Sequence, residues 1–336
     1  RAARALGRPR SRVSVHPVVY ASDTWGVHDQ RWVAALESCG FAVEVFTDGA
    51  ADRDAILAAL PSTAPVLAGP LTTVTRALVD LPRRVVGLSW GFDIQPGHAQ
   101  AAEPGSLDWL PRLDALIVDS PSSSRIAESL GMDPARIHLL PWGIDLEVFP
   151  IEGPAADLGL PAGARVVLSL RRHDDLYRTS DIVEAFGRAA AVDPDLMLVM
   201  GGSGPLTDQH RHRLSELGLA DRVRFTGHVD ETDITPLLRA ADLYVTATET
   251  DGTSVTLLQA MACGAPVLAS AIPGNEWWIE DGVTGRTFAV GDIDALAELM
   301  VSERRSQTRL DAARAAVLER ADWQANRRAL TTIMRP

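Results

Sequence analysis

Short apolar runs alternate with longer stretches of helical periodicity along almost the whole chain. Each run is long enough for a strand, and a polar or glycine-containing turn separates it from the stretch that follows. Parallel strands need crossover helices between them, so this order predicts α/β domains with doubly wound parallel sheets. The runs that predict strands are residues 13–20, 41–46, 65–68, 84–88, 115–118, 137–140, 166–170, 196–200, 223–225, 243–246 and 266–269.

The stretches between these runs predict the helices that cover the sheets. Pro17 interrupts the first run, where we expect a break in the strand. Three prolines and three glycines between residues 150 and 163 indicate a linker. We therefore expect a Rossmann-like domain over residues 1–149 and a second one over 150–318. The predicted helices are residues 32–38, 54–60, 71–79, 108–113, 122–130, 181–192, 206–217, 234–240, 254–263, 293–301 and 307–333.

The helix that we expect to begin near Ser254 is apolar on every side, which predicts a buried helix. Its polar side chains are Thr256 and Gln259, three residues apart and therefore on one face. A buried amide without partners costs about 1–3 kcal/mol, so a polar group should meet Gln259. The free N–H groups at the start of the helix favour a phosphate. We infer that this helix binds a nucleotide diphosphate and its ribose, although a cap at Asp251 and a structural amide at Gln259 are the alternatives.

Composition and charge restrict the kinds of partner. The 336 residues are 46% hydrophobic, carry a formal net charge of −12 and include no lysine. Nucleic acids and anionic membrane surfaces attract basic proteins, so we expect neither as a partner. Two cysteines far apart in the chain, and no apolar run long enough to cross a bilayer, favour a cytoplasmic protein without a transmembrane segment.

Six short motifs with glycine, proline or acidic residues occur in a fixed order, at residues 141–149, 199–205, 222–227, 240–243, 259–267 and 281–285. In this order and spacing they resemble the motifs of the retaining GT-B glycosyltransferases of family 4. The resemblance implies two Rossmann-like domains facing each other across a cleft, with the C-terminal helix 319–336 joining the first domain. It also implies transfer of a sugar, without metal or cofactor, from a nucleotide-diphosphate donor, UDP-sugar favoured, to a small-molecule acceptor.

The second half holds the residues that the resemblance assigns to the donor. The family has two glutamates eight residues apart across its donor loop, and here Asp251 and Gln259 occupy those positions. Its diphosphate-binding Arg and Lys correspond to Arg171 or Arg172 and, more loosely, to Arg178. We therefore predict catalytic roles for Asp251, Arg172 and Arg178. The predicted donor-binding residues are Gly204, Gly227, Gly252, Thr253, Ser254, Val255 and Gln259.

Two turns in the first half follow predicted strands and are expected to meet the acceptor. The first turn, residues 22–29, includes His28, a candidate for acid–base work. In the second, Trp90 stands where the family often has a histidine. Turn formation and core packing are the alternatives for these side chains. The predicted acceptor-binding residues are Trp25, Gly26, Asp29, Trp90 and Asp93.

No convincing metal-ligand pattern occurs. His173 with Asp174 and Asp175 is one isolated cluster, and we predict no metal site there. His210 and His212 lie in a polar stretch and are expected to be solvated. A glycosyltransferase is the first functional hypothesis. A non-catalytic homologue that binds a nucleotide or sugar ligand is the second, motivated by the family's missing glutamates, and a sugar-nucleotide epimerase is a third.

Overall fold

The computed structural model describes residues 16–47, 63–95 and 106–335, together with residues 54, 56 and 58. Its strands form two six-stranded sheets in separate parts of the chain. Contacts divide the chain into two compact units, one of Arg1–Leu88, Arg112–Leu116 and Arg327–Pro336, the other of Ser89–Pro111 and Ile117–Asn326. The boundary near residue 149 that the linker composition favours stays a prediction.

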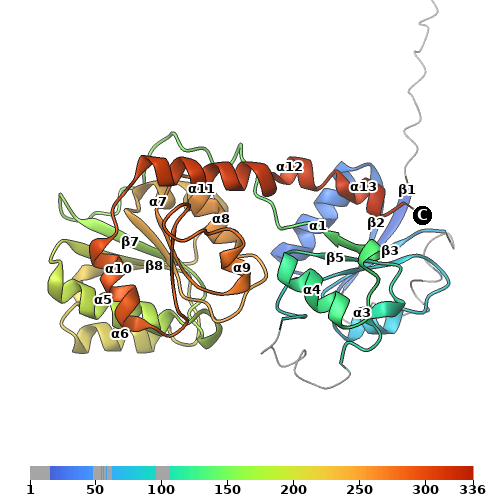
Figure 1. The fold of residues 1–336 in the computed structure, drawn as a ribbon, viewed down its shortest axis with the longest axis horizontal. Coiled ribbons are helices and arrows are strands. Elements are labelled where there is room, and N and C mark those ends of the chain that lie inside the picture. Colours follow the sequence, from blue (N-terminus) through green and yellow to red (C-terminus); the bar gives the residue numbers. More distant parts are fainter. Residues whose placement is uncertain are drawn as a thin grey trace, which may run out of the picture. The chain divides into compact units, whose positions relative to one another are not determined.

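The first sheet has the strand order β2-β1-β3-β4-β5-β6. Pro17 does not interrupt β1, contrary to the prediction, because it lies where β1 pairs with β2 but not yet with β3. The helix predicted over 54–60 lies largely outside the described residues. The strands are β1 (His16–Ala21), β2 (Phe41–Phe46), β3 (Val66–Ala68), β4 (Val85–Leu88), β5 (Ala115–Val118) and β6 (Ile137–Leu139), and the helices are α1 (Val27–Ser38), α3 (Thr73–Leu78) and α4 (Pro121–Ser129) (Figure 1).

The second sheet has the order β12-β11-β10-β7-β8-β9, and its strand pairs run parallel. Consecutive strand residues face opposite layers of helices: Leu168 and Tyr244 belong to one apolar cluster, Val167 and Val245 to the other. Both faces of this sheet are therefore covered, as continuous apolar runs predict. Its strands are β7 (Arg165–Leu170), β8 (Leu196–Gly201), β9 (Val223–Gly227), β10 (Leu243–Thr246), β11 (Val267–Ser270) and β12 (Arg286–Phe288).

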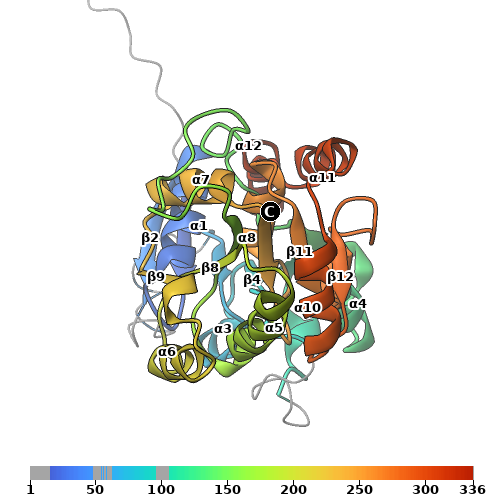
Figure 2. The same ribbon diagram turned by 90° about the vertical axis from the view of Figure 1, so that its left-hand side faces the viewer.

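Helices cover this sheet on both faces (Figure 2). Side chains of α5 (Thr179–Val192), α6 (Thr207–Glu216) and α10 (Ile293–Ser302) pack in one cluster. Those of α7 (Glu231–Ala240), α8 (Val255–Ala262) and α11 (Gln307–Arg320) pack in the other. The sequence predicted most of these elements, but not the short α9 (Pro273–Glu276) or β12.

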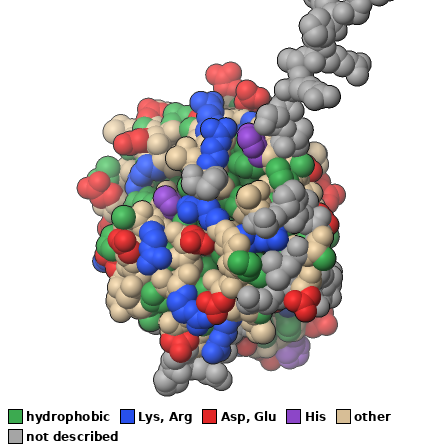
Figure 3. Space-filling view, turned by 90° about the vertical axis from the view of Figure 1, so that its right-hand side faces the viewer, with side chains coloured by type: hydrophobic (Ala, Val, Ile, Leu, Met, Phe, Trp, Pro, Cys, Tyr) green, Lys and Arg blue, Asp and Glu red, His purple; other side chains and the backbone are tan. Residues whose placement is uncertain are grey.

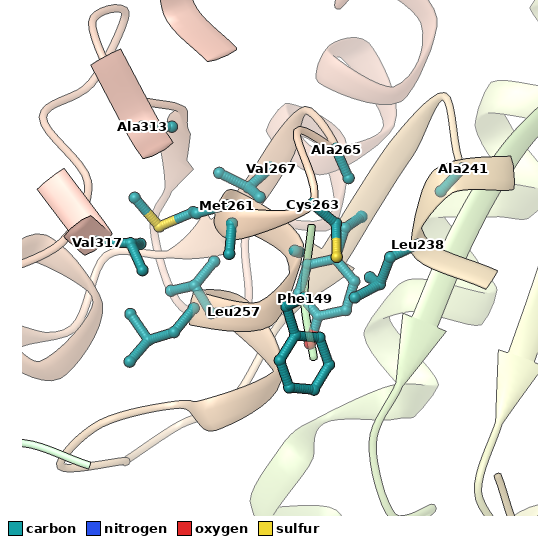
Figure 4. Packing of buried hydrophobic residues seen from close by; sticks show 14 of the residues in the cluster. Phe149, Leu238, Ala241, Leu257, Met261, Cys263, Ala265, Val267, Ala313 and Val317 are labelled. Carbon is teal, nitrogen blue, oxygen red and sulfur yellow. The ribbon is translucent and has the colours of Figure 1, made fainter. Parts of the chain in front are cut away.

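Helix α8 is the buried helix that the sequence predicted. Leu257 and Met261 are inaccessible to solvent and lie among Phe149, Leu238 and Val317, from three other parts of the chain (Figure 4). Ser254 is its N-cap residue, although its side chain does not bond the helix backbone. At roughly 2–5 kcal/mol for truncating one such large apolar side chain, this packing fixes the position of the helix.

The C-terminal segment is not the single helix predicted over 307–333. It is divided into α11, α12 (Trp323–Asn326) and α13 (Ala329–Ile333). The break occurs because Ile144 N–H donates to the Ala321 carbonyl at 2.8 Å and Trp323 N–H donates to the Ile144 carbonyl at 3.1 Å. These bonds replace helical ones, so α11 ends there. The helix predicted over 108–113 is only a 3₁₀ turn, Leu110–Arg112.

Charged side chains of both signs are interspersed on the face that Figure 3 shows, with arginines near acidic and apolar groups. Within the described ranges, every helix is too short or too polar to span a lipid bilayer.

Candidate functional site

The order of the second sheet reverses between β7 and β10, since β7 pairs with β8 on one side and with β10 on the other. In doubly wound sheets, ligands bind beyond the carboxyl ends of the strands at such a reversal. Arg171 follows β7, and the segment Thr250–Ser254, here called the donor loop, lies between β10 and α8. The topology therefore brings Arg171, the donor loop and the start of α8 together.

A pocket of about 340 Å³ lies at this edge of the sheet. Leu170 and Arg171 line it from the end of β7, and Gly202 from the loop after β8. His228 lines it from the loop after β9, and Thr256 from α8. Its lining combines apolar side chains and glycine backbone with polar and charged side chains, which suits a polar small-molecule ligand.

Glycines let the loop after β8 approach β7 closely. Gly202 has φ 94°, and a Cβ on it would lie 2.6 Å from the Arg171 carbonyl oxygen. Its N–H donates to the Gly227 carbonyl at 2.6 Å. A Cβ on Gly204 would overlap the His173 carbonyl. Gly202 thus lines the pocket, whereas the predicted site residues Gly204 and Gly227 lie next to the lining residues and do not line it themselves.

Arg171 is the cation at the start of α8. Its guanidinium donates to Asp251 Oδ2 and to Ser254 Oγ, both at 2.8 Å, and lies 4.1 Å from the ring centroid of Tyr177. Burial lowers the pKa of Arg171, but the charge of Asp251, the neighbouring Tyr244 and Tyr177 and the hydrogen bond to Asp251 together raise the pKa above its ordinary value. A fixed positive charge beside the positive end of a helix favours an anion at this position.

The two arginines that the sequence favoured lie further out. Arg172 is exposed and pairs with Asp174 at 3.1 Å. Arg178 precedes α5 with φ 46°, an unusual conformation for a residue with a side chain, and pairs with Asp181 at 2.7 Å and with Glu249 at 3.7 Å. Arg178 therefore points back toward the segment before the donor loop, whereas Arg172 is a surface residue of the pocket rim.

Gln259 is 6% exposed, and its Oε1 has no hydrogen-bond partner among the described residues. It lies one turn after Thr256, on the same face of α8. Thr256 lines the pocket and accepts a hydrogen bond from the Tyr244 hydroxyl at 2.7 Å. The sequence predicted an amide in need of a polar partner, and none of the described residues donates a hydrogen bond to its carbonyl oxygen.

The residues predicted for the acceptor have mixed surroundings. His28 and Asp29 lie on the first turn of α1 rather than in the expected turn, because the helix already begins at Val27. Asp29 is buried and accepts from the Tyr20 hydroxyl at 2.9 Å and from Gly26 N–H at 2.7 Å. Burial and the nearby carboxylate raise the pKa of Tyr20. Asp29 thus has a structural task at the start of α1, whereas His28 is exposed.

Trp25 is 43% exposed, and Trp90 is half-buried with its ring edge-on to Phe92. Asp93 is buried and accepts from the Ser89 hydroxyl at 2.6 Å and from Trp90 N–H at 3.2 Å. Asp93 therefore closes the turn after β4. Trp25 is the predicted acceptor residue with the most accessible apolar surface.

The prediction that His210 is solvated is wrong. It is 1% exposed, and its ring lies 5.3 Å from that of His173 in an edge-on arrangement. Burial, with a smaller contribution from His173, lowers the pKa of His210 to about 4. His173 Nδ1 shares a 2.8 Å hydrogen bond with Thr207 Oγ1. Side chains that could together hold a metal ion do not cluster anywhere in the part of the chain that the structure describes.

The sequence reading passed over Asp119, which directly follows β5 and is 3% exposed. The sequence pattern that could have indicated Asp119 is its position directly after the apolar run of residues 115–118, at the carboxyl end of a predicted strand. Its carbonyl oxygen accepts from the Thr253 hydroxyl of the donor loop at 3.0 Å. Both residues belong to the second unit.

Known proteins resemble this chain in sequence and in fold. Residues 155–311 match the family described as glycosyl transferases group 1. The D-inositol 3-phosphate glycosyltransferase of Mycobacterium tuberculosis is 39% identical over 181 residues, which make up 51% of this chain and 37% of that relative. The chain thus matches little more than a third of the length of such curated relatives.

Two solved structures share the fold over nearly their whole length. Anabaena HepE, in complex with UDP and glucose, has a TM-score of 0.77 at 19% identity and covers 94% of this chain and 99% of its own. Sucrose-phosphate synthase from Thermosynechococcus elongatus has a TM-score of 0.77 at 20% identity, and the match covers 95% of this chain and 98% of that protein. The chain therefore has the GT-B fold, and its residues 155–311 match the model of the glycosyl transferases group 1 family.

Proposed function

We propose that this chain transfers a sugar from a nucleotide-diphosphate donor, a UDP-sugar in the first instance, to a small-molecule acceptor, with retention of anomeric configuration and without a metal or other cofactor. The observation that carries the proposal is Arg171 at the start of α8, beside a pocket at the reversal point of the second sheet. HepE, which has the same fold, binds UDP and glucose. The proposal further assigns the chain to family 4 and to the cytoplasm.

Different residues would bind different parts of the nucleotide-sugar donor. The nucleoside would occupy the pocket, with its ribose at Gln259, whose buried carbonyl can accept from a hydroxyl. The diphosphate would bind the first N–H groups of α8 together with Arg171. Asp251 would accept from a sugar hydroxyl. Trp25, His28 and Trp90 are the residues that we propose for the acceptor.

Catalysis in this arrangement is mainly electrostatic. When the glycosidic bond to the diphosphate breaks, negative charge develops on the leaving phosphate. Arg171 is fixed by Asp251 and Ser254, and Arg178 by Asp181, so both cations need little rearrangement at that moment. The acceptor hydroxyl attacks from the face that the leaving group vacates, and its proton passes to the departing phosphate, which gives retention.

Calorimetry with UDP tests the binding site. Replacing Arg171 removes a charged hydrogen-bond donor worth about 1.5–3 kcal/mol, so Arg171→Ala should weaken UDP binding by roughly 10–100-fold. Arg188→Ala is the matched control, because Arg188 is half exposed and pairs with the exposed Asp294, away from the pocket-lining residues. Arg172→Ala should have the smaller effect of a surface charge. Equal UDP affinities for all three variants would refute the assigned site.

Turnover is tested separately, with a panel of UDP-sugars and hydroxyl acceptors and with NMR assignment of the product anomer. Release of UDP that depends on an acceptor, with the donor's anomeric configuration kept in the product, is the expected result. UDP binding without turnover on any pair would instead favour the non-catalytic binding protein.

A further inference from the structure

Asp119 lies in an unusual place for a carboxylate. It follows β5, is 3% exposed, and its Oδ1 accepts from the Ser123 hydroxyl of α4 at 3.1 Å. A buried carboxyl with one side-chain donor is poorly solvated, and a charge there is costly unless it is compensated.

The other carboxyl oxygen, Oδ2, packs against bare backbone. A Cβ on Gly91 would lie 2.7 Å from Asp119 Oδ2 and 2.6 Å from the Gly252 Cα, and a Cβ on Gly252 would overlap the Asp119 carboxyl. The Thr253 hydroxyl bonds the Asp119 carbonyl oxygen at 3.0 Å. The donor loop, Thr250–Ser254, is therefore held by Asp119 at two consecutive residues, immediately beside Asp251.

The charged groups around Asp119 are of its own sign. Asp251 approaches from the donor loop and Asp93 from the turn after β4. Arg171 contacts Asp251 and thus neutralises that carboxylate rather than Asp119. Burial, then the charges of Asp251 and Asp93, raise the pKa of Asp119 to about 7, against the smaller effect of the Ser123 hydroxyl.

We propose that Asp119 is a positioning residue: its carboxyl, packed closely against Gly252, sets the conformation in which the donor loop binds the nucleotide diphosphate, and ionisation of this carboxyl displaces the loop. The inference rests on the proposed function, since it concerns the loop assigned to the donor. An ionised Asp119 would lie unpaired against Gly252 and next to Asp251, so the loop would move away from it.

The expected effect follows from the fraction of protein with a neutral carboxyl. If only that form binds, affinity falls in proportion to it, which gives about a tenfold weaker binding of UDP at pH 8 than at pH 6. The donor KM should rise by the same factor, whereas kcat at saturating donor should change by less than about twofold. If Asp119 only stabilised the fold, its ionisation would not raise the donor KM while leaving kcat nearly unchanged.

Calorimetric titration of UDP from pH 6 to pH 8, in the wild type and in Asp119→Asn, tests the proposal. Asparagine keeps the shape and can still accept from Ser123, but it cannot ionise, so its UDP affinity should lose the tenfold decline. The ionisation of UDP itself affects both proteins equally and cancels in the comparison. Asp133→Asn, which changes an exposed carboxylate on the protein surface, is the matched control and should keep the wild-type profile.

Ser123→Ala provides a second variant in case Asp119→Asn does not fold. Removing the hydroxyl that favours the ionised carboxyl should shift the midpoint of the pH profile upward. Wild-type UDP binding that is independent of pH, or identical profiles in wild type, Asp119→Asn and Ser123→Ala, would overturn the inference and leave the proposed function intact. An absence of UDP binding at every pH would instead refute the proposed function.

Discussion

Replacing Gly202 by alanine tests whether backbone packing builds the pocket wall. Gly202 has φ 94°, so alanine at this position carries a conformational cost of about 1–2 kcal/mol. The new Cβ would also lie 2.6 Å from the Arg171 carbonyl oxygen and 3.2 Å from its carbonyl carbon. Relieving such an overlap in a packed region costs about 1–3 kcal/mol more. We therefore expect a total destabilisation of about 2–5 kcal/mol.

Gly218→Ala separates the two contributions. Gly218 also has a positive φ, 70°, but a Cβ there would have no heavy atom within 4 Å. It should show only the conformational cost. The two variants should thus differ by about 1–3 kcal/mol, and each kcal/mol lowers the melting midpoint by about 2–4 °C for a unit of this size.

Thermal melting with and without UDP measures both consequences. Gly202→Ala should melt below Gly218→Ala, and it should also bind UDP more weakly, because the displaced backbone carries Arg171, the side chain that we propose to bind the diphosphate. Equal melting midpoints together with equal UDP affinities would show that the loop after β8 does not depend on this close approach, and the account of the pocket wall would be wrong.

Three further outcomes are expected. Gln259→Met should weaken UDP binding by about tenfold without lowering the melting midpoint, because the fold gives the Gln259 carbonyl no partner to lose; unchanged UDP affinity would remove the ribose assignment. Burial depresses the folded-state pKa of His210 to about 4, so the contribution of neutral His210 to the free energy of unfolding should be fully present above the unfolded pKa of about 6.5. As the pH drops toward 4, the free energy of unfolding measured by denaturant titration should fall by roughly 1–3 kcal/mol. His210→Gln should flatten this pH dependence. Burial raises the pKa of Cys263 to about 11, so a thiol reagent should modify it only after unfolding, and rapid reaction of native Cys39→Ser protein would contradict this.

The sequence by itself determined the alternation of strands and helices, because apolar periodicity is a local property that each segment expresses on its own. Helix α8 shows this most clearly: its uniform apolar character predicted both its start at Ser254 and its burial. The exceptions were segments governed by remote contacts. Ile144 ends α11 through backbone hydrogen bonds from about 180 residues away in the chain, which no local pattern could indicate.

The tertiary structure decided which of several similar side chains reach the site. Arg171 and Arg172 are adjacent and chemically alike, but the end of β7 directs one toward Ser254 and Asp251 and leaves the other in solvent. His210 and His212 differ in the same way, since only the former faces His173. Asp119 gains its significance from neighbours such as Gly91, Gly252 and Thr253, which are distant in sequence. Sequence patterns fix residue types and periodicity, whereas pairing, burial and charge proximity exist only once separate strands share an edge of one sheet.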